Sequence, residues 1–146
     1  MTIVMEMSTD HDIQTTTLNA AWNPVTSRFT WNQIIAHGLH IAQGQRIVVI
    51  AHGNNTEIGD AKPTPHGANV DASTFLALIQ GNMAQNAHPG EIFISTCGKD
   101  IAGFAAAVKL AAQHNAIWHN IRIHGHNTAK AGPVPPPNDL SWTTIF

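Results

Sequence analysis

Three short apolar runs stand out along the middle of the chain, at residues 46–51, 91–96 and 116–124. The first two are rich in β-branched residues and uninterrupted, which is typical of strands that are buried on both faces of a sheet. Apolar and polar positions alternate after Trp118 in the third run, and this indicates one more exposed face. The pattern therefore predicts three core strands.

Between these runs, apolar residues recur at the spacing of a helix face. The spacing predicts a helix over residues 71–85, with Asp71 as its amino-terminal cap, and another over 101–114 behind Asp100. A further helix is predicted over 31–42, ahead of the first core strand. Alternation of helices and strands favours an α/β fold with a mostly parallel sheet and flanking helices.

The two ends of the chain add weaker signals. Strands are expected over residues 2–7 and around 28–30, and a closing strand follows the proline-rich stretch near the carboxyl end. We therefore predict one α/β domain over 1–146, with a proline-rich arm over 132–146 and antiparallel edge strands from the N- and C-terminal segments.

Charge is scarce in this chain. Charged residues make up 11% of the sequence, against about 25% in a typical soluble domain. A net charge of −2 leaves no positive excess for a phosphate backbone, so nucleic acid is not expected as a partner. Because proteins with little net charge tend to associate, we expect a homo-oligomer or docking on a larger partner.

Targeting signals and the number of cysteines indicate the cellular compartment in which the protein is expected. The sequence has no apolar run of the roughly 20 residues that a membrane span needs, and its N-terminus lacks the basic residue of a secretory signal. One cysteine cannot form an internal disulfide, which favours a reducing compartment. We predict a cytoplasmic protein, or one exported without a conventional signal peptide, and no membrane partner.

Reactive side chains follow two of the predicted core strands. His52-Gly53 follows the first strand and Cys97-Gly98 follows the second. Ligands of parallel sheets bind beyond the carboxyl ends of the strands, so His52 and Cys97 can face each other across a substrate gap. Taken singly, either residue is more often a buried structural side chain. As a pair, they suggest a nucleophile and its base, because Cys97 precedes a helix whose amino end favours thiolate.

These residues carry a family resemblance. Residues 47–53, Ile-Val-Val-Ile-Ala-His-Gly, and residues 92–98, Ile-Phe-Ile-Ser-Thr-Cys-Gly, resemble the paired signature of the caspase-like (clan CD) cysteine peptidases. In that group one hydrophobic strand ends in His-Gly, and a later one ends in a small residue before the nucleophilic cysteine. The alanine-rich helix after Cys97 resembles the CHAT domains and the self-cleaving protease domains of large bacterial toxins. The resemblance covers about residues 46–124.

The resemblance implies a three-layer caspase-like (caspase-hemoglobinase) sandwich with about six core strands. It also implies peptide-bond hydrolysis through a Cys-His dyad and a thioester, with a polypeptide substrate and no cofactor, as in a bacterial effector or processing factor. Cys97 would be the thiol nucleophile, and His52 the general acid/base that protonates the leaving amine. The backbone N–H groups of Gly53 and Cys97 would form the oxyanion hole, with Gly98 beside them at the substrate.

Two other functions stay open. His124 and His126 share a face of an extended strand, and together with His52 they could form an open zinc site for hydrolysis. No carboxylate base stands in a recognised metallopeptidase motif, so this metal-hydrolase alternative is weaker. The other alternative is a non-catalytic caspase-like binding module, because low charge, four tryptophans and the proline-rich tail suit a docking surface.

An acidic segment after His52 bears on specificity. Glu57, Asp60 and Asp71 could favour a basic substrate residue in the first subsite, although a solvated acidic loop is the more common arrangement.

Overall fold

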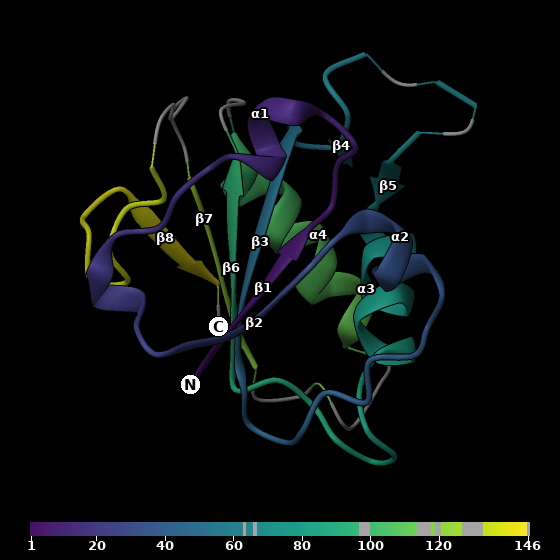
Figure 1. The fold of residues 1–146 in the computed structure, drawn as a ribbon, viewed down its shortest axis with the longest axis vertical. Coiled ribbons are helices and arrows are strands. Elements are labelled where there is room, and N and C mark those ends of the chain that lie inside the picture. The colour runs from purple at the N-terminus through teal and green to yellow at the C-terminus, as the bar shows by residue number, and fades with distance from the viewer. Residues whose placement is uncertain are drawn as a thin grey trace.

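A mainly parallel sheet organises the protein (Figure 1). The main path of the sheet has the order β2-β1-β3-β6-β7-β8, in which only β8 is antiparallel to its neighbour. The short strands β4 and β5 form an antiparallel extension from the end of β3. The strands are β1 (Thr2–Glu6), β2 (Val25–Phe29), β3 (Arg46–Gly53), β4 (Glu57–Gly59), β5 (Asn69–Asp71), β6 (Glu91–Thr96), β7 (Arg122–His126) and β8 (Trp142–Ile145). The computed structural model describes residues 1–62, 64–65, 67–96, 100–113, 118, 121–126 and 133–145.

Helices of unequal length cover the two faces of this sheet. The apolar residues of α2, α3 and α4 join the core on one face, whereas those of α1 and η1 join a smaller cluster on the other. None of the helices in the described ranges is long and apolar enough to cross a bilayer. The helices are α1 (His11–Gln14), η1 (Ala20–Trp22, a 3₁₀ turn), α2 (Trp31–Ile35), α3 (Ala72–Gly81) and α4 (Ile101–Ala112).

The alternation of side chains along β3 explains the two cores. Ile47 and Val49 belong to the larger core under the long helices, whereas Val48 and Ile50 belong to the smaller cluster. Because successive side chains of a strand point to opposite faces, His52 follows Val48 and Ile50 on the face that α1 covers. The sheet thus presents His52 at its carboxyl end on the side of the short helices.

Several sequence predictions are confirmed. The fold is α/β, with a mostly parallel sheet and flanking helices. The run 91–96 forms β6, and the run 46–51 forms most of β3. Asp71 caps α3 by accepting a hydrogen bond from the Thr74 N–H at 2.9 Å. The closing segment returns as β8, an antiparallel edge strand.

The N-terminal segment was predicted to add antiparallel edge strands, and this is wrong. β1 lies inside the sheet, parallel to both β2 and β3, and β2 is the parallel edge strand. The run Thr2–Glu6 is fully buried, as expected for a strand with neighbours on both sides.

Helix lengths also differ from the prediction. The helix expected over 31–42 ends at Ile35, and His37 and His40 then adopt left-handed backbone conformations with φ of 57° and 50°. The helix expected over 71–85 ends at Gly81, because the chain turns to pair Met83 with Ile41 in an isolated bridge.

The last predicted core strand and the last predicted cap need correction as well. The strand expected over 116–124 is β7, Arg122–His126; Trp118 lies in a 3₁₀ turn, and residues 116–117 and 119–120 fall outside the described residues. Asp100 occupies the N-cap position of α4 as predicted, but its side chain makes no cap hydrogen bond and its φ is 63°. A left-handed residue therefore begins this helix.

Candidate functional site

The strand order singles out one place at the edge of the sheet. The chain runs from β1 to β2 on one side, and from β3 through β6, β7 and β8 on the other. The order therefore reverses between β1 and β3, and ligands of such sheets bind outside the carboxyl ends of the strands at this switch point. The segment after β1 and the end of β3 meet there (Figure 1).

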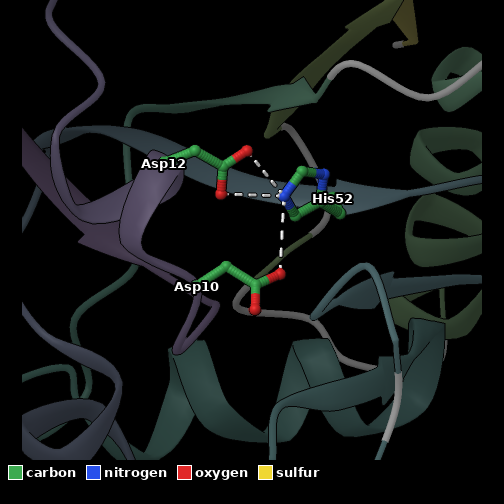
Figure 2. A group of neighbouring side chains, drawn as sticks. All are labelled: Asp10, Asp12 and His52. Atoms are coloured by element: carbon green, nitrogen blue, oxygen red, sulfur yellow. Dashed lines mark hydrogen bonds and ion pairs between the residues drawn. The ribbon is translucent and has the colours of Figure 1, made fainter.

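His52 and two aspartates occupy this switch point (Figure 2). The Nε2 atom of His52 lies 3.0 and 3.1 Å from the two carboxylate oxygens of Asp12, and 3.4 Å from Oδ2 of Asp10. The His52 side chain is 15% exposed, whereas those of Asp10 and Asp12 are 33% and 66% exposed. The histidine is thus held at the base of the site and the aspartates reach toward solvent.

This contact determines which nitrogen of His52 carries the proton. A carboxylate oxygen only accepts hydrogen bonds, so Nε2 must donate to it. The neutral ring then has its hydrogen on Nε2 and an accepting lone pair on Nδ1. Figure 2 shows the carboxylates at one edge of the ring and the second nitrogen on the side away from them. The aspartates therefore orient His52 as a base that acts through Nδ1.

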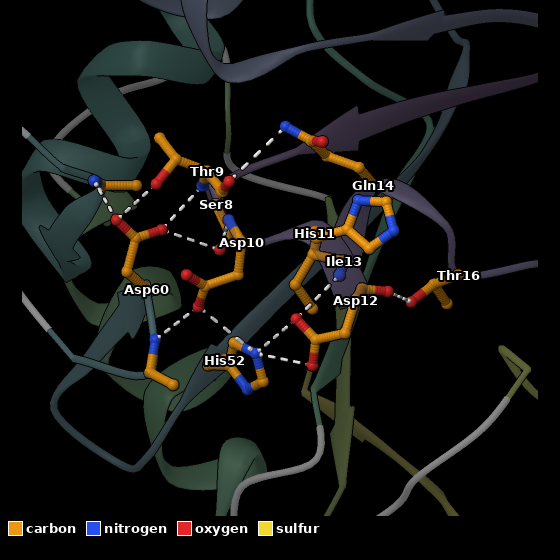
Figure 3. A network of polar contacts seen from close by, with 12 residues as sticks. Ser8, Thr9, Asp10, His11, Asp12, Ile13, Gln14, Thr16, His52 and Asp60 are labelled. Carbon is orange, nitrogen blue, oxygen red and sulfur yellow. Dashed lines mark hydrogen bonds and ion pairs between the residues drawn. The ribbon is translucent and has the colours of Figure 1, made fainter.

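Asp60 fixes the loop that carries the two aspartates (Figure 3). Its carboxylate accepts hydrogen bonds from the Thr9 N–H at 2.6 Å, the Thr9 and Ser8 hydroxyls at 2.8 Å, and the Ala68 N–H at 3.0 Å. Burial alone would raise the pKa of Asp60, but these hydrogen bonds outweigh it and hold the pKa below its ordinary value. The loop after β1 is therefore tied to the β4–β5 connection.

Backbone N–H groups orient each of the two carboxylates. Oδ2 of Asp10 accepts from the Ala61 N–H at 2.8 Å, and Oδ1 of Asp12 accepts from the Ile13 N–H at 3.0 Å. Each carboxylate thus contacts both His52 and a peptide group, which limits its rotation.

Arg28 holds α1 against the sheet. Its guanidinium pairs with the buried carboxylate of Glu6 and donates to the carbonyl oxygens of Thr16 at 2.8 Å and Ile13 at 3.1 Å. Cations at the carboxyl end of a helix satisfy its last carbonyl groups. Because α1 contains Asp12, this pair on β1 and β2 also sets the position of the site.

Cys97, Lys99 and Gly98 fall outside the described residues. The neighbouring strand pair is described, however: β3 and β6 run in parallel, with Ala51 opposite Thr96 as their last paired residues. In the sequence, His52 follows Ala51 and Cys97 follows Thr96. The two predicted catalytic residues therefore come directly after partners that face each other in the sheet.

Gly53 has a steric reason to be glycine. It lies opposite Ile58 in the antiparallel pair of β3 and β4. A Cβ atom at Gly53 would come within 2.6 Å of the Ile58 side chain and 2.8 Å of the Glu57 carbonyl oxygen. The close approach of β4 therefore requires glycine here, and the oxyanion-hole role of Gly53 stays a prediction.

His124 is buried in the middle of the sheet, away from its carboxyl edge. Its Nε2 bonds Glu91 Oε2 and its Nδ1 bonds Thr144 Oγ1, both at 2.8 Å, and its ring stacks on Phe93 with 4.0 Å between centroids. The hydrogen bond from His124 is the main cause that lowers the pKa of Glu91, which burial opposes. His124 therefore joins β6, β7 and β8.

The structure does not bring the predicted zinc ligands together. His126 is fully buried within β7, where its ring stacks on Trp142 at 4.2 Å between centroids. Among the described residues, the one group of three His, Cys, Asp or Glu side chains with ligand atoms within 4.8 Å is Asp10, Asp12 and His52. His52 thus gathers carboxylates in place of His124 and His126.

Two of the three acidic residues that follow His52 in the sequence, Asp60 and Asp71, have structural roles. Asp60 binds the loop after β1, and Asp71 caps α3, where the Thr74 N–H is the main cause that lowers the pKa of Asp71. Both carboxylates are thus engaged in contacts within the fold, and a role in a first subsite stays untested.

Sequence reasoning missed Asp10 and Asp12. They follow the predicted strand 2–7, and the rule that led to His52 and Cys97, namely that chemistry follows the strands, applies to them equally. Chemically, the arrangement offers an oriented base, His52, and a set of side chains that can coordinate a metal ion.

Comparisons of the chain with protein-family models, curated proteins and solved structures find no match.

Proposed function

We propose that this protein is a cysteine peptidase of the caspase-like kind, with Cys97 as nucleophile and His52 as general acid/base. The observation that carries the proposal is the orientation of His52. Its Nε2 is held by Asp12 and Asp10 at the switch point of the sheet, on the strand next to the one that Cys97 follows. A histidine that is oriented by carboxylates and adjacent to a thiol is the arrangement that nucleophilic catalysis needs.

The reaction proceeds in two steps. Nδ1 of His52 takes the proton of the Cys97 thiol, and the thiolate attacks the carbonyl carbon of the scissile peptide bond. The resulting imidazolium is stabilised by the two carboxylates at Nε2, and it gives its proton to the leaving amine as the C–N bond breaks. Water then attacks the thioester, with His52 as the base, which releases the acid and regenerates the thiol. Backbone N–H groups of Gly53 and Cys97 would bind the oxyanion.

Three features of the fold support the proposal. The main path of the sheet consists of six strands, in agreement with the six or so core strands that the resemblance implies. Helices on both faces of the sheet are compatible with a three-layer caspase-like sandwich. In addition, α4 begins at Ile101, shortly after Cys97, so the amino end of a twelve-residue helix can favour the thiolate.

Alkylation of Cys97 tests the proposal directly. Iodoacetamide and a peptidyl electrophile are reacted with the folded protein, and the labelled fraction is followed by intact-mass spectrometry. We expect faster labelling than for the urea-unfolded chain, no labelling of Cys97→Ala, and labelling by the peptidyl reagent slowed about 100-fold in His52→Ala. His88→Ala is the matched control, because His88 lies before β6 at the opposite edge of the sheet, and we expect no change in rate.

Two results would contradict the proposal. One is a Cys97 that reacts no faster in the folded protein than in the unfolded chain, at a rate that His52→Ala leaves unaltered. The other is fast labelling together with the absence of cleavage in a mixed peptide library at high protein concentration, which would favour the non-catalytic binding module.

A further inference from the structure

We propose that Asp10, Asp12 and His52 form a binding site for a divalent transition-metal ion, Zn²⁺ in the first place, and that the bound ion switches the base off. The binding part stands on the described side chains alone. The switching part rests on the proposed peptidase function.

The distances between the ligand atoms match the requirement of a tetrahedral ion. Zinc binds imidazole nitrogen and carboxylate oxygen at about 2.1 Å, so two such ligands of a tetrahedral site lie about 3.4 Å apart. His52 Nε2 is 3.4 Å from Oδ2 of Asp10 and 3.0 Å from Oδ2 of Asp12. Small rotations of the two carboxylates therefore suffice to admit the ion between the three atoms.

The charge of the group also favours a cation. Two carboxylates surround one ring nitrogen, and the ring offers a single N–H to both of them. Within the described ranges, neither Asp10 nor Asp12 forms an ion pair with a lysine or arginine. One N–H of a neutral ring leaves the negative charge of the two carboxylates unbalanced, and a divalent ion would offset both of them.

The surroundings of the ligands are ordered on the protein side and open on the solvent side. The Ala61 and Ile13 N–H groups each donate to one ligand carboxylate, which is the kind of outer contact that orients metal ligands. Asp12 is 66% exposed, so an ion can enter from solvent, and water can complete its coordination.

Metal binding would change the tautomer of His52. Without metal, Nε2 carries the hydrogen and Nδ1 accepts the thiol proton. An ion on Nε2 displaces that hydrogen, and the neutral ring must then carry its hydrogen on Nδ1. In that state His52 cannot take a proton from Cys97, because Nδ1 has no lone pair to offer. The ion therefore switches off the base while leaving the thiol in place.

Calorimetric titration with Zn²⁺ tests the binding part. It is performed on the Cys97→Ala variant, so that the thiol cannot contribute. We expect one ion per chain, bound at least about tenfold more weakly in the Asp10→Asn, Asp12→Asn double variant and in His52→Gln. Glu57→Gln removes a carboxylate that is not part of the group, and the variant should bind Zn²⁺ as the Cys97→Ala parent does. Circular dichroism verifies that each variant is folded.

Alkylation of Cys97 by iodoacetamide tests the switching part. In the wild-type protein we expect Zn²⁺ to slow alkylation at least about tenfold and a chelator to restore it. In the Asp10→Asn, Asp12→Asn variant the same Zn²⁺ concentration should have no effect. Equal slowing in both proteins would mean that the ion binds the thiol, and it would overturn the switch.

The outcomes separate this proposal from the peptidase proposal. Zinc affinity that is unchanged by removal of the aspartates or of His52 overturns the site, whatever the reactivity of Cys97. Zinc binding that depends on these three residues, together with a Cys97 that is inert with and without metal, supports the site and contradicts the peptidase. An increase of peptide cleavage on adding Zn²⁺ would overturn the inhibitory role.

Discussion

Replacement of Asp60 by asparagine tests whether this residue holds the loop after β1 in place. Its two carboxylate oxygens accept from two backbone N–H groups, those of Thr9 and Ala68, through different oxygens. An amide of the same shape has only one oxygen. Whichever way the side chain of Asp60→Asn turns, one of the two backbone N–H groups faces an NH₂ group and loses its acceptor.

The free-energy cost follows from these contacts. The asparagine oxygen can stay on the N–H of the fully buried Ala68, and the Thr9 N–H then loses its acceptor. A buried donor without an acceptor costs about 1–3 kcal/mol, and the exposed Thr9 lies at the low end of that range. Hydrogen bonds that keep an oxygen acceptor lose the assistance of the charge, which is worth roughly another 1 kcal/mol. Because Asp60 itself is partly exposed, solvent reduces the sum. We expect Asp60→Asn to lower the free energy of unfolding by about 1–2 kcal/mol at pH 7.

Urea denaturation followed by tryptophan fluorescence measures this difference, with the slope of the transition as a check that the unfolded state is unchanged. Asp71→Asn is the matched control, because Asp71 also has a lowered pKa but caps α3, a role that asparagine fills equally well. The control should stay within about 0.5 kcal/mol of the wild type. A loss that small for Asp60→Asn would refute the reasoning.

The pH dependence gives an independent check on the same variant. The pKa of Asp60 is lowered in the folded protein, so its carboxylate stabilises the fold above the ordinary pKa of 3.8, and this contribution disappears as the pH falls through the folded value. Asparagine does not titrate. The difference between wild type and Asp60→Asn should therefore be constant between about pH 5 and 7 and shrink below 3.8. A difference that grows on acidification contradicts the assigned hydrogen bonds.

Three further substitutions test contacts of the sheet, one of them a control. Gly125→Ala places a Cβ atom 2.7 Å from the carbonyl oxygen of Ile101 in the first turn of α4, and we expect a loss of about 1–3 kcal/mol by urea denaturation. Gly38→Ala meets no atom within 4 Å and should be neutral or slightly stabilising; equal effects of the two would show that α4 does not press on β7. Glu91→Gln weakens the bond from His124, so we expect about 1 kcal/mol less stability at neutral pH. Since the pKa of Glu91 is lowered, this deficit should vanish as the pH falls well below 4.5, and a deficit that persists in acid contradicts the pairing.

The parts of the fold that the sequence predicts well are those where burial dominates. The run 91–96 contains three consecutive buried apolar residues, Ile92, Phe93 and Ile94, and lies between two neighbouring strands, so its strand conformation could be predicted from this pattern. The β4–β5 pair was missed because each strand has three residues and one buried side chain, Ile58 or Val70. Such short segments carry too little alternation to be recognised.

The helix predicted over 31–42 failed for a tertiary reason. Its apolar spacing continues to Ile41, but Ile41 pairs with Met83 beyond α3, and the chain must leave the helix to reach it. His37 and His40 accept the left-handed conformations that this path demands. The local sequence gives one weak sign of this turn, Gly38, which lies between the two histidines inside the predicted helix.

The candidate site was predicted in part. His52 was found because it ends a strong apolar strand, and the topology places it beside the strand that Cys97 follows. Asp10 and Asp12 were missed because the strand before them was expected at an edge of the sheet, whereas β1 lies inside it, next to β3. The order of strands in a sheet depends on contacts between segments far apart in the sequence, and it determines which strands have neighbouring carboxyl ends.

The two faces of the sheet differ in function: one contains the large apolar core, and the other carries the candidate site. One face packs long helices against a continuous apolar core, which gives β3 and β6 a rigid register. The other face is covered by short segments whose positions depend on a few polar contacts, those of Arg28 at α1 and of Asp60 at the loop after β1. His52 belongs to the rigid part and Asp10 and Asp12 to the tethered part. Substitutions of Arg28 or Asp60 should therefore alter any metal binding by Asp10 and Asp12 before they unfold the sheet, since these contacts position the segments that carry the two aspartates.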